Sequence, residues 1–180
     1  DIIKCERIED LPKRYAAVSA DLETGEMVTH ITGELKTAIR ASISIPGIFT
    51  PVIRDGHTLV DGGTLEPLPI AAARALGAEL VLAVDLFGHP DTNERLQQGS
   101  LFQNANVIQI LERSLAVSQA QLTLLRLKEC PADLVITPKV SEVGLLDFNR
   151  GVPLIEVGYT TAKAALPAIQ QLLSCSKTDG

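Results

Sequence analysis

The apolar positions in the first 60 residues fall into short stretches separated by turn residues, a pattern typical of β-strands. Residues 15–22 and 26–32 form the first pair of stretches, and Glu23-Thr24-Gly25 between them is typical of a hairpin turn. Residues 52–60 form a second pair around Asp55-Gly56. The sequence therefore predicts two β-hairpins.

Three other segments have the spacing of helices. Residues 33–42, 104–128 and 152–173 carry apolar side chains at intervals of three and four, which predicts one short helix and two long ones. The expected buried face of the second helix consists of Val107, Leu111, Leu115, Leu122 and Leu125. That of the third helix consists of Leu154, Gly158, Ala162, Ala165, Ile169 and Leu172. Pro167 should kink the third helix, because proline lacks an amide donor and clashes with the preceding turn.

Residues 59–70, Leu-Val-Asp-Gly-Gly-Thr-Leu-Glu-Pro-Leu-Pro-Ile, join a short strand to a predicted short helix. Asp61 falls at the end of the strand, and Gly62 and Gly63 can adopt backbone angles that other residues avoid. Residues 79–86 follow the helix and are rich in Val and Leu without alternation, which is typical of a buried parallel strand. In open α/β sheets ligands bind beyond the carboxyl ends of the strands, so Asp61 lies where a site is expected.

Composition narrows the classes of protein. The chain has 180 residues and a net charge of -6 without a run of Lys or Arg, which argues against nucleic-acid binding. No apolar run reaches the ~18 residues that span a bilayer, although contact with a membrane surface stays open. Cys5, Cys130 and Cys175 include no C-x-x-C pair, which favours reduced thiols and a cytoplasmic location. Because the chain begins at Asp1 without a signal peptide, we expect a piece of a longer polypeptide or a processed chain.

Several common catalytic motifs are absent from these 180 residues. Neither phosphate-binding glycine motif occurs, and the histidines have no metal-ligand spacing, so we expect no cofactor and no metal. The serine turn G-x-S-x-G is also absent. Ser42 and Ser44 lack the flanking glycines of such a turn and are weak candidates for a nucleophile.

An unusually apolar loop precedes the second hairpin. It contains Ile43, Ile45, Ile48 and Phe49 around Pro46-Gly47, a turn signal. Such side chains either pack inside the protein or line an apolar pocket, and both interpretations are open.

Two aspartates at the ends of predicted strands also allow two interpretations. Asp61 precedes Gly62-Gly63, and Asp21 precedes the turn of the first hairpin. An aspartate in either setting can bond to the amides of its own turn. Each is therefore a turn residue or a member of a site.

The order of these motifs resembles the second half of a bacterial patatin-like phospholipase. The resemblance rests on residues 41–51, Ala-Ser-Ile-Ser-Ile-Pro-Gly-Ile-Phe-Thr-Pro, on the Asp-Gly-Gly segment over residues 59–70, and on Leu76-Gly77-Ala78-Glu79. It implies an α/β fold, a three-layer sandwich of a mixed, mainly parallel sheet with helices on both faces and the N-terminal strands missing. Residues 1–180 would then be the C-terminal portion of a single catalytic domain.

The resemblance also implies a lipid acyl hydrolase with a Ser-Asp dyad and no catalytic histidine. Asp61 matches the aspartate of the dyad, whereas the serine turn and the glycine-rich oxyanion loop would precede this segment. Glu66 stands where the family commonly has Asn, a departure that concerns the hydrogen bonds of the turn. The substrate would be a lipid or ester, with its acyl chain against Ile45, Pro46, Ile48 and Phe49, and peripheral membrane contact is expected.

Two rival interpretations remain. The chain is either such a hydrolase or an inactive fragment or relative that serves as an interaction domain and self-associates through an exposed sheet edge. A nucleotide-binding α/β half is weaker, since no phosphate loop is present.

Overall fold

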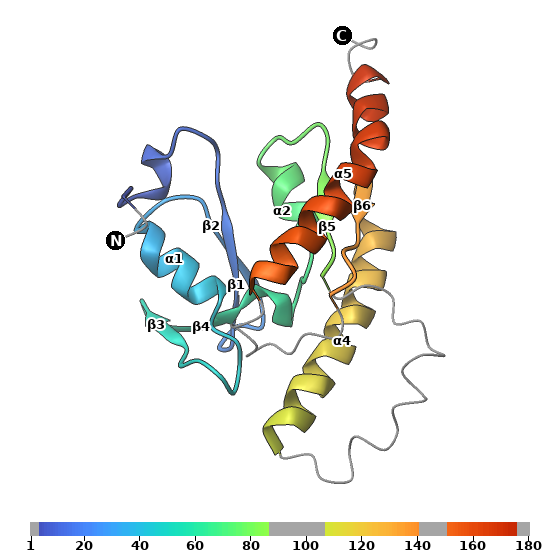
Figure 1. Cartoon of the computed structure of the whole chain (residues 1–180). Helices are drawn as coiled ribbons and strands as arrows, with labels where there is room; N and C mark the ends of the chain where they lie inside the picture. Colours follow the sequence, from blue (N-terminus) through green and yellow to red (C-terminus); the bar gives the residue numbers. More distant parts are fainter. Residues whose placement is uncertain (1–3, 87–106, 141–150, 176–180) are drawn as a thin grey trace.

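The computed structural model describes residues 4–86, 107–140 and 151–175, which form an α/β structure (Figure 1). The strands are β1 (Ala17–Asp21), β2 (Met27–His30), β3 (Val52–Arg54), β4 (His57–Asp61), β5 (Leu82–Val84) and β6 (Leu134–Ile136). The α-helices are α1 (Leu35–Ser42), α2 (Ile70–Ala75), α4 (Val107–Glu129) and α5 (Gly151–Cys175), and the 3-10 turns are η1 (Ile8–Asp10) and η2 (Gly62–Thr64). The first residues of the helix predicted from residue 104 lie outside the described residues.

Both predicted hairpins are confirmed, and they pair into one antiparallel sheet of order β2-β1-β4-β3. The turn between β3 and β4 has positive φ at Asp55 (52°) and Gly56 (82°), a backbone twist that matches the twist of paired strands. The register places Ser19 of β1 opposite Asp61 of β4. The end of β4 is therefore held against the central strand of this sheet.

The expectation of a mainly parallel sheet is wrong. The four-stranded sheet is antiparallel, and β5 and β6 form a separate parallel pair. Connection length explains part of the difference, because the tight turns between β1 and β2 and between β3 and β4 can only reverse the chain, whereas parallel strands need a long crossover. The connection from β5 to β6, which contains α4, provides such a crossover, whereas β1 and β4 pair antiparallel across a long connection that contains α1.

The strand β5 is also less buried than predicted. Leu82 and Val84 are exposed and only Ala83 is buried. In the part of the chain that the structure describes, β6 is the sole strand beside β5, so the other edge of β5 has no paired strand there.

Two small apolar clusters replace one continuous core. The first joins η1, β1 and α1 through Ile8, Ala17, Leu35 and Ala38. The second joins α2 to the β5–β6 pair through Leu68, Ile70, Val81 and Ala83. In Figure 1 the antiparallel sheet and α1 lie on one side of the molecule, and α2, β5, β6 and α4 lie on the other. The turn that follows Asp61 connects these two parts along the chain.

The predicted buried face of α4 is wrong for three of its five residues. Val107, Leu111 and Leu125 are exposed and Leu115 and Leu122 are half-buried, whereas the buried residues are Gln119, Ala120 and Thr123. The helix carries apolar residues on several sides, so periodicity alone did not identify the packed side. Packing against η2 selects it, because the glycines there admit the side chain of Gln119.

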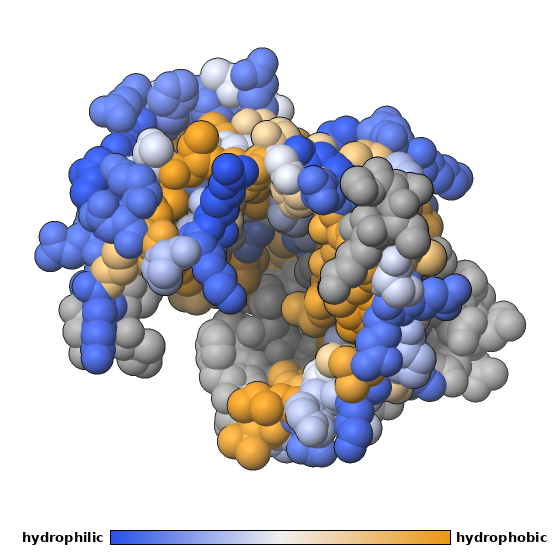
Figure 2. Space-filling model, turned by 90° about the horizontal axis from the view of Figure 1, so that it is seen from above, coloured by the Kyte–Doolittle hydropathy of each residue, from blue (hydrophilic) through white to orange (hydrophobic). Residues whose placement is uncertain are grey.

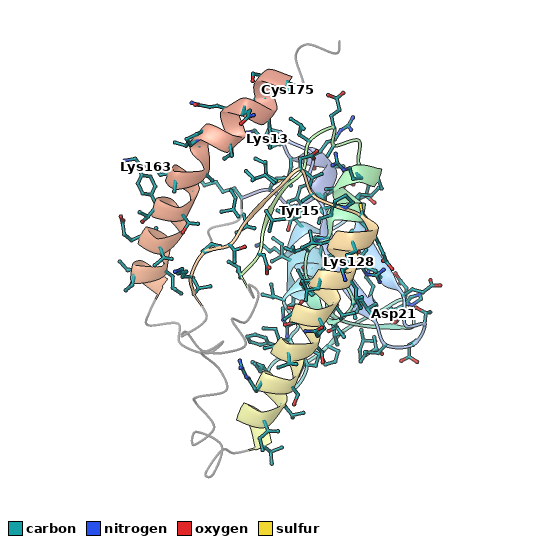
Figure 3. All side chains as sticks on the ribbon, turned by 90° about the vertical axis from the view of Figure 1, so that its right-hand side faces the viewer. Lys13, Tyr15, Asp21, Lys128, Lys163 and Cys175 are labelled. Atoms are coloured by element: carbon teal, nitrogen blue, oxygen red, sulfur yellow. The ribbon has the colours of Figure 1, made fainter. Side chains whose placement is uncertain are left out.

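No residue of α5 is buried, contrary to the prediction. Of the six residues on its expected buried face, Ala162 is exposed and the others are half-buried. The helix packs on β6 and stands apart from α4 in Figure 3. It changes direction along its length in Figures 1 and 3, and Pro167 lies inside it, which agrees with the expected kink.

Candidate active site

Asp61 ends β4 and caps the first turn of η2. Its amide N–H donates to the carbonyl of Ser44 over 3.0 Å, which ties the end of β4 to the apolar loop that follows α1. On its other side the strand pairs with β1. Backbone contacts on both sides therefore fix the position from which the carboxylate projects.

The two oxygens of the Asp61 carboxylate differ. Oδ1 accepts the N–H of Gly63 at 2.7 Å, whereas Oδ2 has no hydrogen bond to any residue that the structure describes. The side chain is half-buried, and this burial raises the pKa of Asp61, while the Gly63 N–H lowers it. One oxygen thus serves the turn, and the other is available to a group that approaches from outside.

The two glycines are needed for space and not, as the sequence suggested, for unusual backbone angles. Neither Gly62 nor Gly63 has a positive φ. A Cβ on Gly62 would lie 2.7 Å from the carbonyl oxygen of Val18, and a Cβ on Gly63 would lie 3.0 Å from Asp61 Oδ1. Glycine is required because the chain approaches β1 and the carboxylate too closely for any side chain.

The apolar loop begins beside Asp61 through the Ser44 carbonyl. Ile45 and Ile48 are half-buried, and Pro46 and Phe49 are exposed, so the loop is only partly packed. The guanidinium of Arg40 lies 5.5 Å from the centre of the Phe49 ring. The loop therefore keeps exposed apolar surface, and its backbone is bonded to that of Asp61 at Ser44.

Ser44 itself has a structural role. It is fully buried, and its hydroxyl accepts from Arg40 Nη1 at 2.5 Å and donates to the Arg40 carbonyl at 2.6 Å. A hydroxyl with both functions engaged and no solvent access cannot reach a substrate.

Two further polar side chains near Asp61 were not singled out by sequence reasoning. Gln119 of α4 is 7% exposed, and its Nε2 lies 2.7 Å from the position that a Cβ of Gly63 would take. The hydroxyl of Thr64 in η2 is buried without a hydrogen-bond partner. Neither residue carries a sequence signal, since Gln119 is a polar residue between Leu115 and Leu122 and the apolar periodicity selects only apolar side chains.

Comparison with known proteins shows which family the chain resembles. A sequence profile described as patatin-like phospholipase matches residues 7–74, which include the apolar loop and the Asp-Gly-Gly turn. An uncharacterised NTE family protein of Mycobacterium tuberculosis is 34% identical over 182 residues, which cover 92% of this chain and 31% of the relative. Residues 7–74 are therefore similar to patatin-like phospholipases.

Other relatives show the same similarity. A second uncharacterised NTE family protein of Mycobacterium tuberculosis is 48% identical over 88 residues, which cover 49% of this chain and 24% of the relative. The mouse protein named patatin-like phospholipase domain-containing protein 7 is 30% identical over 178 residues, which cover 88% of this chain and 13% of the relative. The chain thus spans about a third or less of the length of these relatives.

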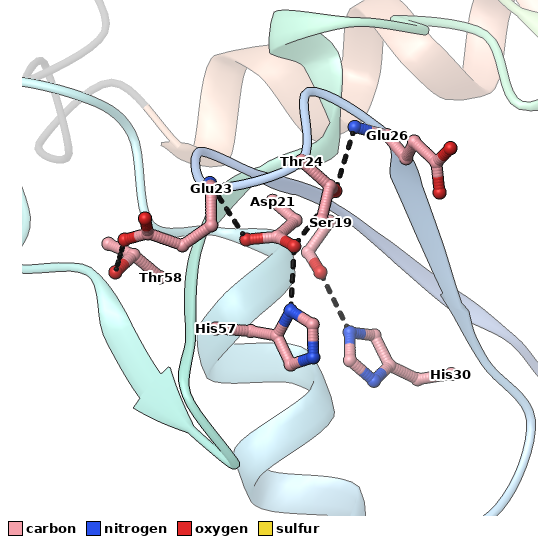
Figure 4. Close-up of polar contacts among 8 residues, drawn as sticks. All are labelled: Ser19, Asp21, Glu23, Thr24, Glu26, His30, His57 and Thr58. Atoms are coloured by element: carbon pink, nitrogen blue, oxygen red, sulfur yellow. Dashed lines mark hydrogen bonds and ion pairs between the residues drawn. The ribbon is translucent and has the colours of Figure 1, made fainter.

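Asp21, the other strand-end aspartate, has its hydrogen bonds satisfied within the sheet (Figure 4). It is 2% exposed and accepts from the Glu23 N–H at 3.1 Å, the Thr24 hydroxyl at 2.9 Å and His57 Nδ1 at 2.7 Å. Burial opposes its charge, but the bonds from His57, Glu23 and Thr24 prevail and lower the pKa of Asp21 to about 2. The turn interpretation of Asp21 is therefore correct, and sequence reasoning missed its partner on β4.

A neighbouring pair on the same sheet is also structural. The Ser19 hydroxyl lies 2.8 Å from His30 Nε2, and Ser19 is fully buried opposite Asp61. Burial and the nearby Arg54 lower the pKa of His30, which keeps its ring neutral at pH 7. Ser19 is inaccessible and so does not supply a nucleophile to the site.

Apolar surface is present on the outside of the molecule. Figure 2 shows hydrophobic areas on both sides of a hollow in one face. A separate pocket of about 360 Å³ is lined by residues 8–15 with Ile31 and Leu76, and neither Asp61 nor the apolar loop borders it.

The described residues contain no group of three or more His, Cys, Asp or Glu arranged to hold a metal ion. Within the same residues, none of the helices has the length and apolar character needed to cross a membrane.

Proposed function

We propose that the complete polypeptide is a lipid acyl hydrolase with a Ser-Asp dyad, in which Asp61 is the base and a residue outside these 180 supplies the serine. The observation that carries this proposal is the Oδ2 atom of Asp61, which has no partner in the described part of the chain although the turn holds Oδ1. The similarity to patatin-like phospholipases supports it, because the matched region contains this turn.

The proposed reaction begins with a proton transfer. The serine hydroxyl gives its proton to Asp61 Oδ2 as its oxygen attacks the carbonyl carbon of the ester. The tetrahedral intermediate then collapses, the alcohol leaves with the proton, and the acyl group remains on the serine. Water, activated by the same carboxylate, releases the fatty acid and restores the serine.

Burial of Asp61 suits this role. An aspartate in water has a pKa of about 3.9 and is a weak base at neutral pH. Partial burial raises the pKa of Asp61, and the bond from Gly63 limits that rise and fixes the orientation of the carboxylate. The side chain thus gains basicity while one oxygen stays anchored.

The apolar loop is the proposed contact for the acyl chain. Ile45, Pro46, Ile48 and Phe49 all keep some exposed surface, and the loop begins at the residue bonded to Asp61. Each CH₂ group that leaves water against such a surface contributes ~0.8 kcal/mol. The proposed substrate is a lipid or another ester. The enzyme is proposed to be cytoplasmic and to contact a membrane peripherally.

The test is Asp61→Asn in the complete polypeptide, assayed with a short-chain ester. The amide still accepts from Gly63 but is not a base, so we expect kcat to fall ~10²–10⁴-fold with an unchanged melting temperature. Asp55→Asn is the matched control, since Asp55 is an exposed turn residue at φ 52°, which Asn tolerates. Near-normal turnover of a folded Asp61→Asn variant would reject the proposal.

The 180-residue chain alone is expected to hydrolyse no ester, because it lacks the proposed nucleophile. Measurable turnover that survives further purification, and that Ser42→Ala or Ser44→Ala abolishes, would place the nucleophile inside the chain instead.

An interaction domain is the second candidate. Ile53 on the edge strand β3 is 80% exposed, and α5 presents Val152, Ile155 and Tyr159 to solvent. Exposed apolar side chains at a sheet edge favour self-association. Sedimentation of wild type and Ile53→Lys distinguishes the two candidates: an oligomer that the lysine dissociates, together with full activity of Asp61→Asn, would favour this role.

A further inference from the structure

Gln119 occupies an unusual position for an amide side chain. It is 7% exposed on α4, and its carboxamide makes no hydrogen bond to any residue that the structure describes. Among the described residues, the buried side-chain polar atom without a partner is the hydroxyl oxygen of Thr64, so the amide of Gln119 is not fully enclosed. A leucine of similar size would fill the same space but could not donate a hydrogen bond.

The geometry at Gly63 brings this amide close to Asp61. The point where a Cβ of Gly63 would stand is 2.7 Å from Gln119 Nε2 and 3.0 Å from Asp61 Oδ1. The missing side chain of Gly63 therefore leaves a space that the amide and the carboxylate enter from different elements, α4 and β4. The structure shows no hydrogen bond between them, and bonds of this kind are commonly long in an incomplete site.

Two other unpartnered groups lie in the same turn. They are the buried hydroxyl of Thr64 and Asp61 Oδ2. Satisfied polar groups are the rule in protein interiors. The Thr64 hydroxyl departs from that rule, and it lies beside a carboxylate oxygen and an amide that make no hydrogen bond within the described residues, so a polar group can approach this turn.

We propose that Gln119 is a positioning residue for Asp61: its amide N–H donates to the Asp61 carboxylate when the nucleophile-bearing segment completes the site, and holds Oδ2 toward the serine. This inference rests on the proposed function. It adds a residue from α4 that acts through Asp61 and touches neither the substrate nor the serine.

The charged groups around Asp61 do not substitute for this donor. Arg40 of α1 is bonded to Ser44 and Thr50. His30 of β2 is bonded to the hydroxyl of Ser19, and Ser19 pairs with Asp61 across the sheet. Burial and the Gly63 N–H are the influences on the pKa of Asp61. A donor from Gln119 would be the second hydrogen bond to the carboxylate.

The experiment measures kcat, KM and the pH dependence of kcat/KM for the complete polypeptide with Gln119→Leu and Gln119→Glu. Loss of a donor to a carboxylate raises its pKa, so the acid limb of the profile should move to higher pH in Gln119→Leu. A glutamate of equal size adds a like charge and should move that limb further. We expect kcat to fall about ten- to a hundredfold with little change in KM, the loss expected for one charge-assisted hydrogen bond.

Gln121→Leu is the matched control, since Gln121 is an exposed glutamine on the same helix. If Gln119→Leu matches Gln121→Leu in kcat and in its acid limb, the inference is overturned. A lower kcat with an unmoved acid limb would also overturn it, because a packing defect gives that result. Asp61→Asn, measured beside these variants, separates the two proposals. Full activity of Asp61→Asn would reject the Ser-Asp dyad and the positioning role together. An inactive Asp61→Asn with a normal Gln119→Leu would reject only the positioning role.

Discussion

Two aspartates end paired strands of the same sheet, Asp21 on β1 and Asp61 on β4, and their surroundings differ sharply. Three donors surround the Asp21 carboxylate and lower its pKa to about 2. Among the described residues one donor reaches the Asp61 carboxylate, and burial raises its pKa. Both residues are aspartates at a turn, so residue type and turn do not distinguish them. The number of carboxylate oxygens that accept hydrogen bonds separates the carboxylate that stabilises the fold from the one that is free to accept a proton.

The largest expected effect is a contrast between the two aspartates: substitution of Asp61 should lower activity, whereas substitution of Asp21 should lower stability. In the complete polypeptide, Asp61→Asn should lower kcat ~10²–10⁴-fold and leave the melting temperature unchanged, since general-base help is worth that factor. Asp21→Asn should lower the melting temperature and leave kcat of the folded enzyme near normal. The rate of ester hydrolysis and the melting temperature of both variants test this prediction. Similar changes in kcat and in melting temperature for the two variants would contradict it.

A substitution in the turn itself should reduce stability. Gly62→Ala would place a methyl group 2.7 Å from the backbone oxygen of Val18, and overpacking against backbone costs about 1–3 kcal/mol. Gly63→Ala meets the flexible end of Gln119 at 2.7 Å and should cost less. Urea unfolding of the two variants measures the difference. Equal stability would show that β1 moves to accommodate the turn.

The Asp21 network should weaken when its charge is removed. Asp21→Asn keeps an acceptor for the Glu23 N–H but loses the charged partner of His57 over 2.7 Å, so the free energy of unfolding should fall. Urea unfolding at pH 7 measures the loss. Asp55→Asn, which changes an exposed turn carboxylate, is the control and should be neutral.

The smallest effect is the pH dependence of stability, which should have opposite signs at the two sites. The folded pKa of Asp21, about 2, is below the unfolded value of 3.8, so its stabilisation is complete above about pH 4 and is lost as the pH falls from there through 2. The folded pKa of Asp61 is raised, so protonation favours the folded state. Acid unfolding should therefore be shallower in Asp21→Asn than in wild type. An identical pH dependence would contradict the network.

Sequence reasoning reached the elements whose causes are local. The hairpin turn at Asp55-Gly56 and the α2 helix after Pro69 follow from the residues themselves, because positive φ and fixed φ are properties of the local chain. The motif around Asp61 was recognised for the same reason. Its catalytic role stays a proposal.

The predictions that failed were those that depend on which other part of the chain packs against a segment. The buried face of α4 was chosen from its leucines, yet Gln119 and Thr123 are the buried residues. The reason for Gly62 was also misassigned, because its close neighbour Val18 lies on β1, 44 positions earlier in the chain.

The amino-acid sequence by itself determined the two hairpins, the helices and the carboxylate at the end of β4, since turn chemistry and periodicity act over a few neighbouring residues. Only the tertiary structure decided that three donors converge on Asp21, that Asp61 keeps one oxygen open, and that Gln119 lies beside it. Those outcomes depend on strand register and helix packing, which bring together atoms that the order of residues leaves far apart.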